Sequence, residues 1–338
     1  MVTYIIRRLI AAVLMLVIVS IATFSIFFVI PRAAGVTASD FANRYVGVKG
    51  ATAETVKATA EKLGFYDPLV VQYGRWVKGI VAGSEFDTGV DVEHCPAPCF
   101  GYSFITKQPV WPDLLDRLPV TLSLAVGASV IWLVTGVATG VLSALRRGSI
   151  FDRGAMTVAL AGVSLPIFFT GIVSLVFFSY KFGITAPGGS YTPITENPAE
   201  WAYDLILPWI TLAFLLSAAY ARLTRAGMLE TMSEDYIRTA RAKGLREPRV
   251  IVKHGLRAAL TPIVTIFGLD LGLLLGGAIL TETTFSLNGI GKYGVHAIAV
   301  GDLPQILGVT TVATFFVVFA NLAVDLLYAV VDPRVRLG

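Results

Sequence analysis

The residues of this sequence that could take part in chemistry are few, and their spacing argues against catalysis. Its three histidines, His94, His254 and His296, are dispersed along 338 residues. Nucleophilic catalysis needs a Ser, Cys or Thr within hydrogen-bond reach of a base that a third group orients. The sequence indicates no such Ser/His/Asp or Cys/His arrangement, so we expect that the chain is not an enzyme.

A glycine-rich string from Gly289 to Gly294 fits the G-x-G-x-x-G pattern of dinucleotide-binding turns, and Gly291-Lys292 resembles the end of a phosphate-binding loop. The first pattern requires a preceding buried strand in a βαβ unit, whereas this string follows a long apolar run. The second lacks its leading glycine, because position 286 is Ser286, and Tyr293 replaces the Ser or Thr that binds magnesium. We expect that this chain binds no cofactor.

The cysteines Cys95 and Cys99 allow three interpretations. They could form a disulfide, bind a metal together with His94, or remain free thiols. A structural zinc site normally has four ligands, and only three lie close together here. We favour the disulfide and no metal, because we expect this segment to lie outside the cytoplasm, where oxidation favours disulfides.

Two acidic residues lie within or directly after a long apolar run. Asp270 stands between Leu269 and Leu271, and Glu282 follows the end of the run. A carboxylate in the middle of a bilayer costs roughly 3 kcal/mol or more unless it faces a polar pathway or a partner. Both residues are therefore candidates for such a pathway, although Glu282 could equally be a gate contact or a solvated helix end.

The composition indicates that membrane helices position these residues. The sequence is 55% hydrophobic and 15% charged, with a mean hydropathy of +0.72, which lies outside the range of soluble globular proteins. A helix needs about 20 apolar residues to cross a bilayer core. Six stretches without Lys or Arg qualify: Leu9–Ile30, Thr121–Ala144, Ala155–Tyr180, Leu205–Ala221, Ala258–Thr281 and Ile306–Val331. We predict an all-α membrane protein with six transmembrane helices.

The first stretch also resembles a secretory signal peptide, since Arg7 and Arg8 precede it and Ala33-Ala34-Gly35 follows. It is longer than a typical signal-peptide core, and five more stretches follow, so we interpret it as an uncleaved helix.

The orientation follows from the distribution of Lys and Arg. Segments 1–8, 145–154, 222–257 and 332–338 hold 16 cations in 61 residues, whereas the alternating loops hold 11 in 138. Cationic loops tend to stay in the cytoplasm, so both termini are expected there. The positive net charge then reflects topology and indicates no nucleic-acid partner.

These spans divide the chain into three parts. Residues 1–30 form the cytoplasmic N-terminus and first helix, residues 31–120 form an extracytoplasmic segment, and residues 121–338 form a five-helix core with the cytoplasmic loop 222–257. Within the second part, Ala51–Gly64 is predicted to be helical, because Thr52 can cap its start and Gly64 can end it.

The loop 222–257 carries the signals of a short independent helix. Ser233 is a plausible N-cap, Asp235 adds negative charge in the first turn, and Gly244 can end a helix of about ten residues. With about 3.6 residues per turn, four side chains of this helix are predicted to share one face, and the side chains at the centre of that face are small. This face consists of Tyr236, Thr239, Ala240 and Lys243.

Beyond this helix, Pro248 is predicted to break the chain, and Arg249–Leu260 to form a second helix leading into the fifth span. An ordinary cationic loop would explain the charge alone. The caps, the small side chains and the breaks together favour a helix that docks into a partner.

One string in this loop is specific enough to compare with known proteins. It runs Asp235-Tyr236-Ile237-Arg238-Thr239-Ala240-Arg241-Ala242-Lys243-Gly244-Leu245 and continues to His254-Gly255-Leu256-Arg257 and Pro262. It resembles the EAA loop of bacterial ABC-importer permeases, most narrowly those of the dipeptide/oligopeptide/nickel family. Further matches in the family's order are Leu63-Gly64, Asp67-Pro68-Leu69, Gln72-Tyr73, Ile206-Leu207-Pro208, Leu280-Thr281-Glu282, Asn288-Gly289-Ile290-Gly291 and Asp332-Pro333-Arg334-Val335-Arg336.

The resemblance implies a type I ABC importer transmembrane domain in a bacterial plasma (inner) membrane. Its partners would be a sister permease, two ABC ATPase subunits that bind ATP and Mg, and an extracytoplasmic substrate-binding protein. In that family the coupling helix of the loop sits in a cleft of the ATPase. Carried over, the contact falls on Asp235, Tyr236, Arg238, Thr239, Ala240, Arg241, Ala242, Lys243, Gly244 and Leu245.

The family further implies di- or oligopeptides as substrates, with nickel chelates or glutathione as alternatives, because specificity rests largely on the binding protein. Asp270 would then face the cavity between the two permeases, where it could meet a peptide's amino group or bond to the sister subunit. An ATP-independent secondary transporter is a rival of another class. It would be expected to show inverted repeats or several intramembrane charges.

Two features depart from the family pattern. Residues around Gly83–Tyr102 add length to the first external segment, and Thr239-Ala240-Arg241 replaces the acidic-Ala-Ala opening of the EAA loop.

Overall fold

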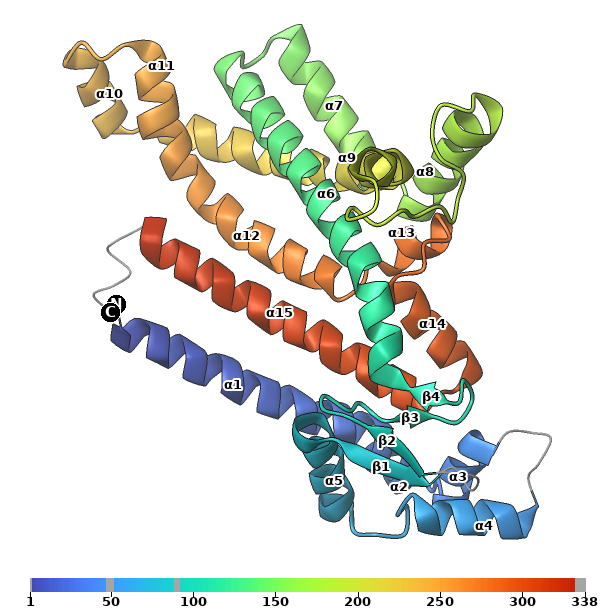
Figure 1. Cartoon of the computed structure of the whole chain (residues 1–338). Helices are drawn as coiled ribbons and strands as arrows, with labels where there is room; N and C mark the ends of the chain where they lie inside the picture. The colour runs from blue at the N-terminus through green and yellow to red at the C-terminus, as the bar shows by residue number, and fades with distance from the viewer. Residues whose placement is uncertain (1, 47–51, 88–91, 332–338) are drawn as a thin grey trace. The chain divides into compact units, whose positions relative to one another are not determined.

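The computed structural model describes residues 2–46, 52–87 and 92–331 (Figure 1). The segment 332–338, with the family-like motif Asp332 to Arg336, lies outside these residues. Contacts divide the chain into two units. The first comprises Met1–Pro119 and Asn288–Phe319, and the second comprises Val120–Leu287 and Ala320–Gly338. Residues 288–319 are thus grouped with the first part of the chain, whereas the sequence division placed them with residues 121–338.

Helices account for most of the described chain. In the first part of the chain they are α1 (Val2–Phe24), the π-helical η1 (Ser25–Val29), α2 (Ile30–Ala33), α3 (Ala38–Val46), α4 (Ala53–Lys62) and α5 (Leu69–Ala82). Then follow α6 (Val110–Leu145), α7 (Ile150–Ser164), α8 (Ile167–Ser174), the π-helical η2 (Leu175–Lys181), α9 (Pro198–Met232) and α10 (Asp235–Ala242). The last are α11 (Glu247–Arg249), the π-helical η3 (Val250–Leu256), α12 (Arg257–Leu275), α13 (Ile279–Thr284), α14 (Ile290–Val300) and α15 (Leu303–Val331).

The predicted all-α membrane fold is confirmed. Within the described residues, five helical stretches are long and apolar enough to cross a membrane, and a bent pair adds a sixth if it counts as one span. The five are Ile5–Ala33, Val110–Leu145, Pro198–Met232, Glu247–Leu275 and Leu303–Val324. The bent pair is Ile150–Ser164 with Ile167–Lys181.

The third stretch is broken where the sequence predicted one continuous run. α7 ends at Ser164, and the chain bends by 103° before α8 begins at Ile167. Leu165 adopts an extended conformation (φ −86°, ψ 130°), because the ring of Pro166 disfavours helical geometry in the residue before it. Pro166 itself stands directly before α8, where a missing N–H costs no hydrogen bond.

The fifth stretch also differs from its predicted limits at Ala258 and Thr281. It begins at Glu247, because α11, η3 and α12 follow one another without a break. Pro248 lies in the first turn, where proline is tolerated, and so the predicted break there is wrong. The helix ends at Leu275, since Gly277 takes a positive φ of +124° before α13 starts.

An aromatic core holds the first unit together around the end of α1. Phe24 stacks on Phe28 with ring centroids 4.6 Å apart, and Phe28 stacks on Phe41 of α3. The helix predicted at Ala51–Gly64 is confirmed for Ala53–Lys62, which form α4, whereas Ala51 lies outside the described residues. The N-cap of α4 is Thr52, which forms a reciprocal capping box with Thr55.

Two short antiparallel hairpins follow α5. The strand β1 (Ser84–Asp87) pairs with β2 (Val92–Cys95), and β3 (Tyr102–Ser103) pairs with β4 (Gln108–Pro109). In the first hairpin Ser84 lies opposite Cys95. The residues around Gly83–Tyr102 that add length relative to the family pattern thus include both strands of the first hairpin; residues 88–91 lie outside the described residues.

The second unit has its core between α6, α9 and α12. Trp132, Tyr220 and Ile263 are fully buried there. Glycines let α6 approach α9 closely, since a Cβ at Gly136 would lie 2.7 Å from the Cβ of Tyr220. A Cβ at Gly140 would lie 2.5 Å from the Cβ of Thr224. These distances are shorter than carbon atoms tolerate, so only glycine fits at both positions.

Candidate functional site

The short helix predicted in loop 222–257 is α10, but it starts one residue later than expected. Its N-cap is Glu234, whose side chain makes no capping bond. The predicted cap, Ser233, instead donates from its hydroxyl group to the carbonyl of Glu230, at 2.7 Å, in the last turn of α9. α10 spans eight residues rather than ten, and Gly244 (φ +75°) follows it in the left-handed conformation.

The inner face of α10 is apolar and anchors it to η3. Ile237 (0% exposed) and Ala240 (6%) pack against Val250, with Leu245 beside them. The predicted face of Tyr236, Thr239, Ala240 and Lys243 is therefore wrong for Ala240. The helical period places position 240 on the same side as 237, and the apolar side chain of Ile237 decides which side turns inward.

The outer face of α10 and its C-terminal turn are exposed. They present eight of the ten residues that the family resemblance assigned to the contact: Asp235, Tyr236, Arg238, Thr239, Arg241, Ala242, Lys243 and Gly244. The outer face carries both signs of charge, and Arg238 lies 3.3 Å from Asp235. Burial raises the pKa of the Tyr236 hydroxyl group above its usual value, and the nearby Glu234 adds to this.

A bidentate ion pair links α10 to the start of the following helix. Arg241 donates from Nε and from its terminal nitrogen to the two carboxylate oxygens of Glu247, at 3.1 and 2.7 Å. These bonds raise the pKa of Arg241, although partial desolvation opposes them. Because Glu247 is the first residue of α11, the pair joins α10 to the helix that continues through η3 into α12.

Asp270 lies in α12 and has a partner in α9. The hydroxyl group of Tyr220 donates to the Asp270 carboxylate at 2.8 Å. Tyr220 is 1% exposed and packs near Trp132, whereas Asp270 is only partly buried. Sequence reasoning missed Tyr220, because a tyrosine in an apolar run is an ordinary core residue until its neighbour is known.

Glu282 lies in α13 and is fully buried (0% exposed). It accepts a hydrogen bond of 2.8 Å from the hydroxyl group of Thr121 in α6. The interpretation of Glu282 as a solvated helix end is therefore wrong, because its side chain is buried and bonded to α6. The bond to Thr121 spans 161 positions of sequence, which is why no local pattern indicated it.

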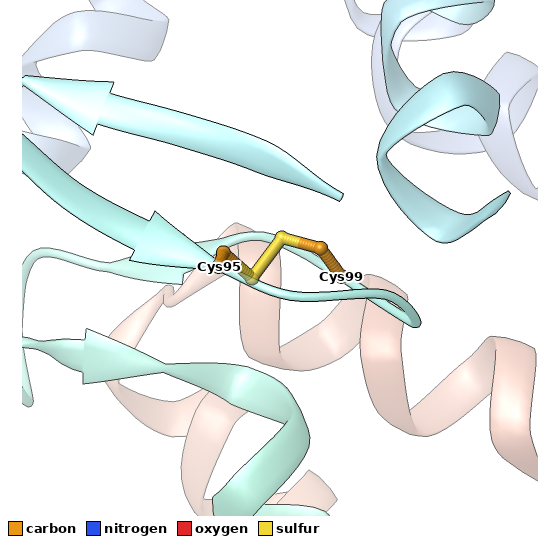
Figure 2. The surroundings of a disulfide bond; sticks show 2 residues. All are labelled: Cys95 and Cys99. Carbon is orange, nitrogen blue, oxygen red and sulfur yellow. A yellow bond between two sulfur atoms is a disulfide. The ribbon is translucent and has the colours of Figure 1, made fainter. Parts of the chain in front are cut away.

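The two cysteines form a disulfide after the first hairpin (Figure 2). Cys95, at the end of β2, and Cys99 have Cα atoms 5.6 Å apart and a sulfur–sulfur distance of 2.06 Å. Both are buried. The glycine-rich string, by contrast, begins α14 at Ile290 with Gly289 as its N-cap, and it follows a helix and a turn rather than a strand.

The comparisons with known proteins agree over both halves of the chain. Residues 136–337 match the family described as "Binding-protein-dependent transport system inner membrane component". Residues 1–125 match "Binding-prot-dependent transport system membrane comp, N-term".

Two relatives match over most of their length. The dipeptide transport system permease protein DppB of Escherichia coli (strain K12) is 35% identical over 99% of both chains. The di/tripeptide transport system permease protein DppB of Pseudomonas aeruginosa (strain UCBPP-PA14) is 39% identical over 81% of this chain and 83% of its own.

The fold also resembles that of a solved transporter. A chain of the inward-facing MetNI methionine ABC transporter superposes with a TM-score of 0.52, covering 65% of this chain and 96% of its own at 20% identity. The sequence matches span the whole chain, and the helical fold agrees with them. The chain therefore belongs to the inner membrane permeases of binding-protein-dependent transport systems, which are the membrane subunits of ABC importers.

Proposed function

We propose that this chain is one permease subunit of an ATP-driven importer of di- and oligopeptides in a bacterial inner membrane. Its relatives include permeases named for dipeptide and di/tripeptide transport. In this family ATP hydrolysis occurs on separate ATPase subunits, so the chain is a transport subunit and not an enzyme. The complex would contain a sister permease, two ATPases that bind ATP and Mg, and an extracytoplasmic binding protein.

The observation that carries the coupling part of this proposal is the construction of α10. Ile237 and Ala240 fix its inner face, the Arg241–Glu247 pair fixes its end, and the outer face remains open. A helix held in this way can seat in a cleft of an ATPase without losing its own packing. In this proposal the eight exposed residues contact the ATPase, whereas Ala240 and Leu245 pack beneath them and hold α10 in place.

The proposed mechanism uses the continuity of the chain after α10. Closure of the ATPase dimer moves α10, and the Arg241–Glu247 pair passes the displacement to α11. Since α11, η3 and α12 form one helical path, the displacement reaches Asp270 in α12. The carboxylate of Asp270, oriented by Tyr220, meets the amino group of a peptide in the pathway. ATP binding then shifts the population between inward- and outward-open states.

An enlarged side chain on the outer face of α10 tests the coupling contact. Ala242 is small and exposed, so Ala242→Trp should leave the fold intact and prevent seating in the ATPase. We expect ATP-dependent uptake of a labelled dipeptide by the reconstituted complex to fall at least about tenfold. We also expect less of the ATPases to co-purify with the variant. Ala199→Trp, at an exposed alanine in the first turn of α9, is the matched control.

Two results would contradict the proposal. Unchanged uptake by the Ala242→Trp complex would show that α10 is not the contact. Transport by this chain alone in proteoliposomes, without ATPases or ATP, would instead identify an ATP-independent transporter.

A further inference from the structure

The first unit contains a cavity of about 380 Å³ next to the end of the first helix. Its lining comes from α1 and η1, from α4 and α5 with the turn between them, from the segment that includes β1 and β3, and from the start of α15. The volume lies in the range of about 300 to 1,000 Å³ that is usual for small-molecule sites. Nothing in the coupling mechanism uses this cavity.

Aromatic rings form much of the cavity wall. Phe24 and Phe28 are stacked, and the indole ring of Trp76 lies 6.3 Å from the ring of Phe24. On the hairpin side, Phe86 stacks on Tyr102 at 6.0 Å. Such a wall binds an apolar body, and the faces of its rings attract a cation.

Two polar side chains in the wall keep an unused hydrogen-bonding atom. Gln72 is 7% exposed, and its amide nitrogen donates to the carbonyls of Phe65 and Asp67 at 3.2 and 2.9 Å. Its Oε1 has no partner among the described residues, and the same holds for the indole nitrogen of Trp76. The two residues are one helical turn apart on α5, and neither atom bonds to the other. Both atoms are fully buried beneath the wall, so the rings and the charges of the lining carry its ligand preference.

The charged residues around the cavity leave an excess of negative charge. Lys62 pairs with Asp87 at 2.9 Å, and Arg75 pairs with Asp67 at 2.6 Å. The lining also contains Glu61 and Glu85. Glu85 lies 3.8 Å from a histidine, His94, which compensates its charge only when protonated. The two cations of the lining, Lys62 and Arg75, are thus both paired. The carboxylates of Glu61 and Glu85 can therefore attract a positively charged ligand.

We infer that this cavity binds a small organic ammonium ion with an aromatic or aliphatic body. The body lies against the aromatic wall, which includes the indole ring of Trp76, and the ammonium group is attracted by Glu61 and Glu85. With the proposed topology the cavity faces the outside of the cell. Binding there does not require that the chain transport peptides.

Equilibrium binding to the full-length chain in phosphatidylcholine nanodiscs tests this site without ATP. At pH 8, phenethylamine carries both the charge and the body. Its neutral isostere 2-phenylethanol lacks the charge, and ethylamine lacks the body. We expect one phenethylamine per chain, bound at least about tenfold more tightly than either analogue. Empty nanodiscs correct for partition into lipid.

Substitutions in the lining assign the binding to this cavity. Trp76→Phe, and separately Glu61→Gln combined with Glu85→Gln, should each weaken phenethylamine binding at least about tenfold. Trp111→Phe and Glu54→Gln, which change residues outside the lining, should leave it unchanged. Glu61 and Glu85 are exposed, so their variant remains a valid test if Trp76→Phe fails to fold.

Three results would overturn the inference: equal binding of phenethylamine and 2-phenylethanol, binding that the lining variants do not change, or binding no greater than to empty nanodiscs. Because the assay needs no transport, a failure of peptide uptake by the complex would count against the proposed function and leave this site standing.

Discussion

The hydrogen bond between Tyr220 and Asp270 places an acidic group at a defined point of α12. In the proposed mechanism this group meets the amino end of the substrate. Asp270→Asn keeps the size of the side chain and removes its charge. We expect peptide uptake by the reconstituted complex to fall about tenfold, equivalent to about 1.4 kcal/mol of lost interaction, with the complex still assembled. Tyr220→Phe should lower uptake less, because the charge remains.

Asp116→Asn, at an exposed residue of α6, controls for a general effect of removing one carboxylate. If Asp270→Asn left both uptake and assembly unchanged, Asp270 would have no role in the pathway. If it reduced assembly instead, the residue would bond to the sister subunit.

Asp302, which directly precedes α15, makes part of the stability depend on pH. Its side chain is 3% exposed. Burial raises its pKa, Asp113 adds to the rise, and the hydrogen bonds from Ser103 and Gln305 and the nearby His296 oppose it. The folded state therefore holds this proton more tightly than the unfolded chain. The stabilisation is complete below the unfolded pKa, about 4, and is lost as the pH rises through the raised folded value.

Asp302→Asn should remove this contribution. We expect thermal unfolding of the detergent-solubilised protein, followed between pH 4 and 7, to show a smaller decline of stability with rising pH in the variant than in the parent. The exposed Asp116→Asn variant should keep the parent's slope. An unchanged slope in Asp302→Asn would mean that Asp302 does not titrate in this range.

At the scale of elements, an ion pair fastens the start of α7 to α9. Arg225 donates from Nε and from its terminal nitrogen to the two oxygens of Asp152, at 2.6 and 2.8 Å, and Asp152 is 3% exposed. Arg225→Met leaves this carboxylate without its cation, which destabilises the folded state. We expect a clear loss of thermal stability. Arg153→Met, at the exposed neighbour of Asp152, should change stability little; equal effects would show that the pair does not fasten α7.

The elements that the sequence predicted best are those with local signals. Thr52 caps α4 as expected, and Gly244 follows α10, because both effects act over a few residues. Helix ends that depend on competition between several sequence signals were predicted wrongly. Pro166 divides a run that composition alone treats as continuous, and Pro248 starts a helix that it was expected to break.

The candidate site was predicted in part for the same reason. The exposed string of α10 could be located from its sequence, whereas the inward position of Ala240 depends on the packing of Ile237 against Val250. Pairs such as Thr121 with Glu282, 161 positions apart, leave no local trace. The aromatic cavity was missed entirely, because its lining comes from distant segments of the chain.

At the scale of the whole molecule, the distribution of cations predicts the orientation in the membrane. Ala242 should face the cytoplasm, and Ala199 should face outward. In a background with Cys95→Ser and Cys99→Ser, a membrane-impermeant maleimide added to intact spheroplasts should label Ala199→Cys and spare Ala242→Cys. Lysis should make both accessible. The reverse pattern in intact spheroplasts would invert the topology and move the aromatic cavity to the cytoplasmic side.

The glycines at 136 and 140 limit the motions that are open to the second unit. With no Cβ between them, the backbones of α6 and α9 interlock so closely that neither helix can slide along the other without steric overlap. We therefore expect the contacting parts of α6 and α9 to move together. If the proposed alternating access holds, we expect its bending to occur at other points of this unit, such as the bend at Leu165-Pro166 and the glycine pair Gly276-Gly277.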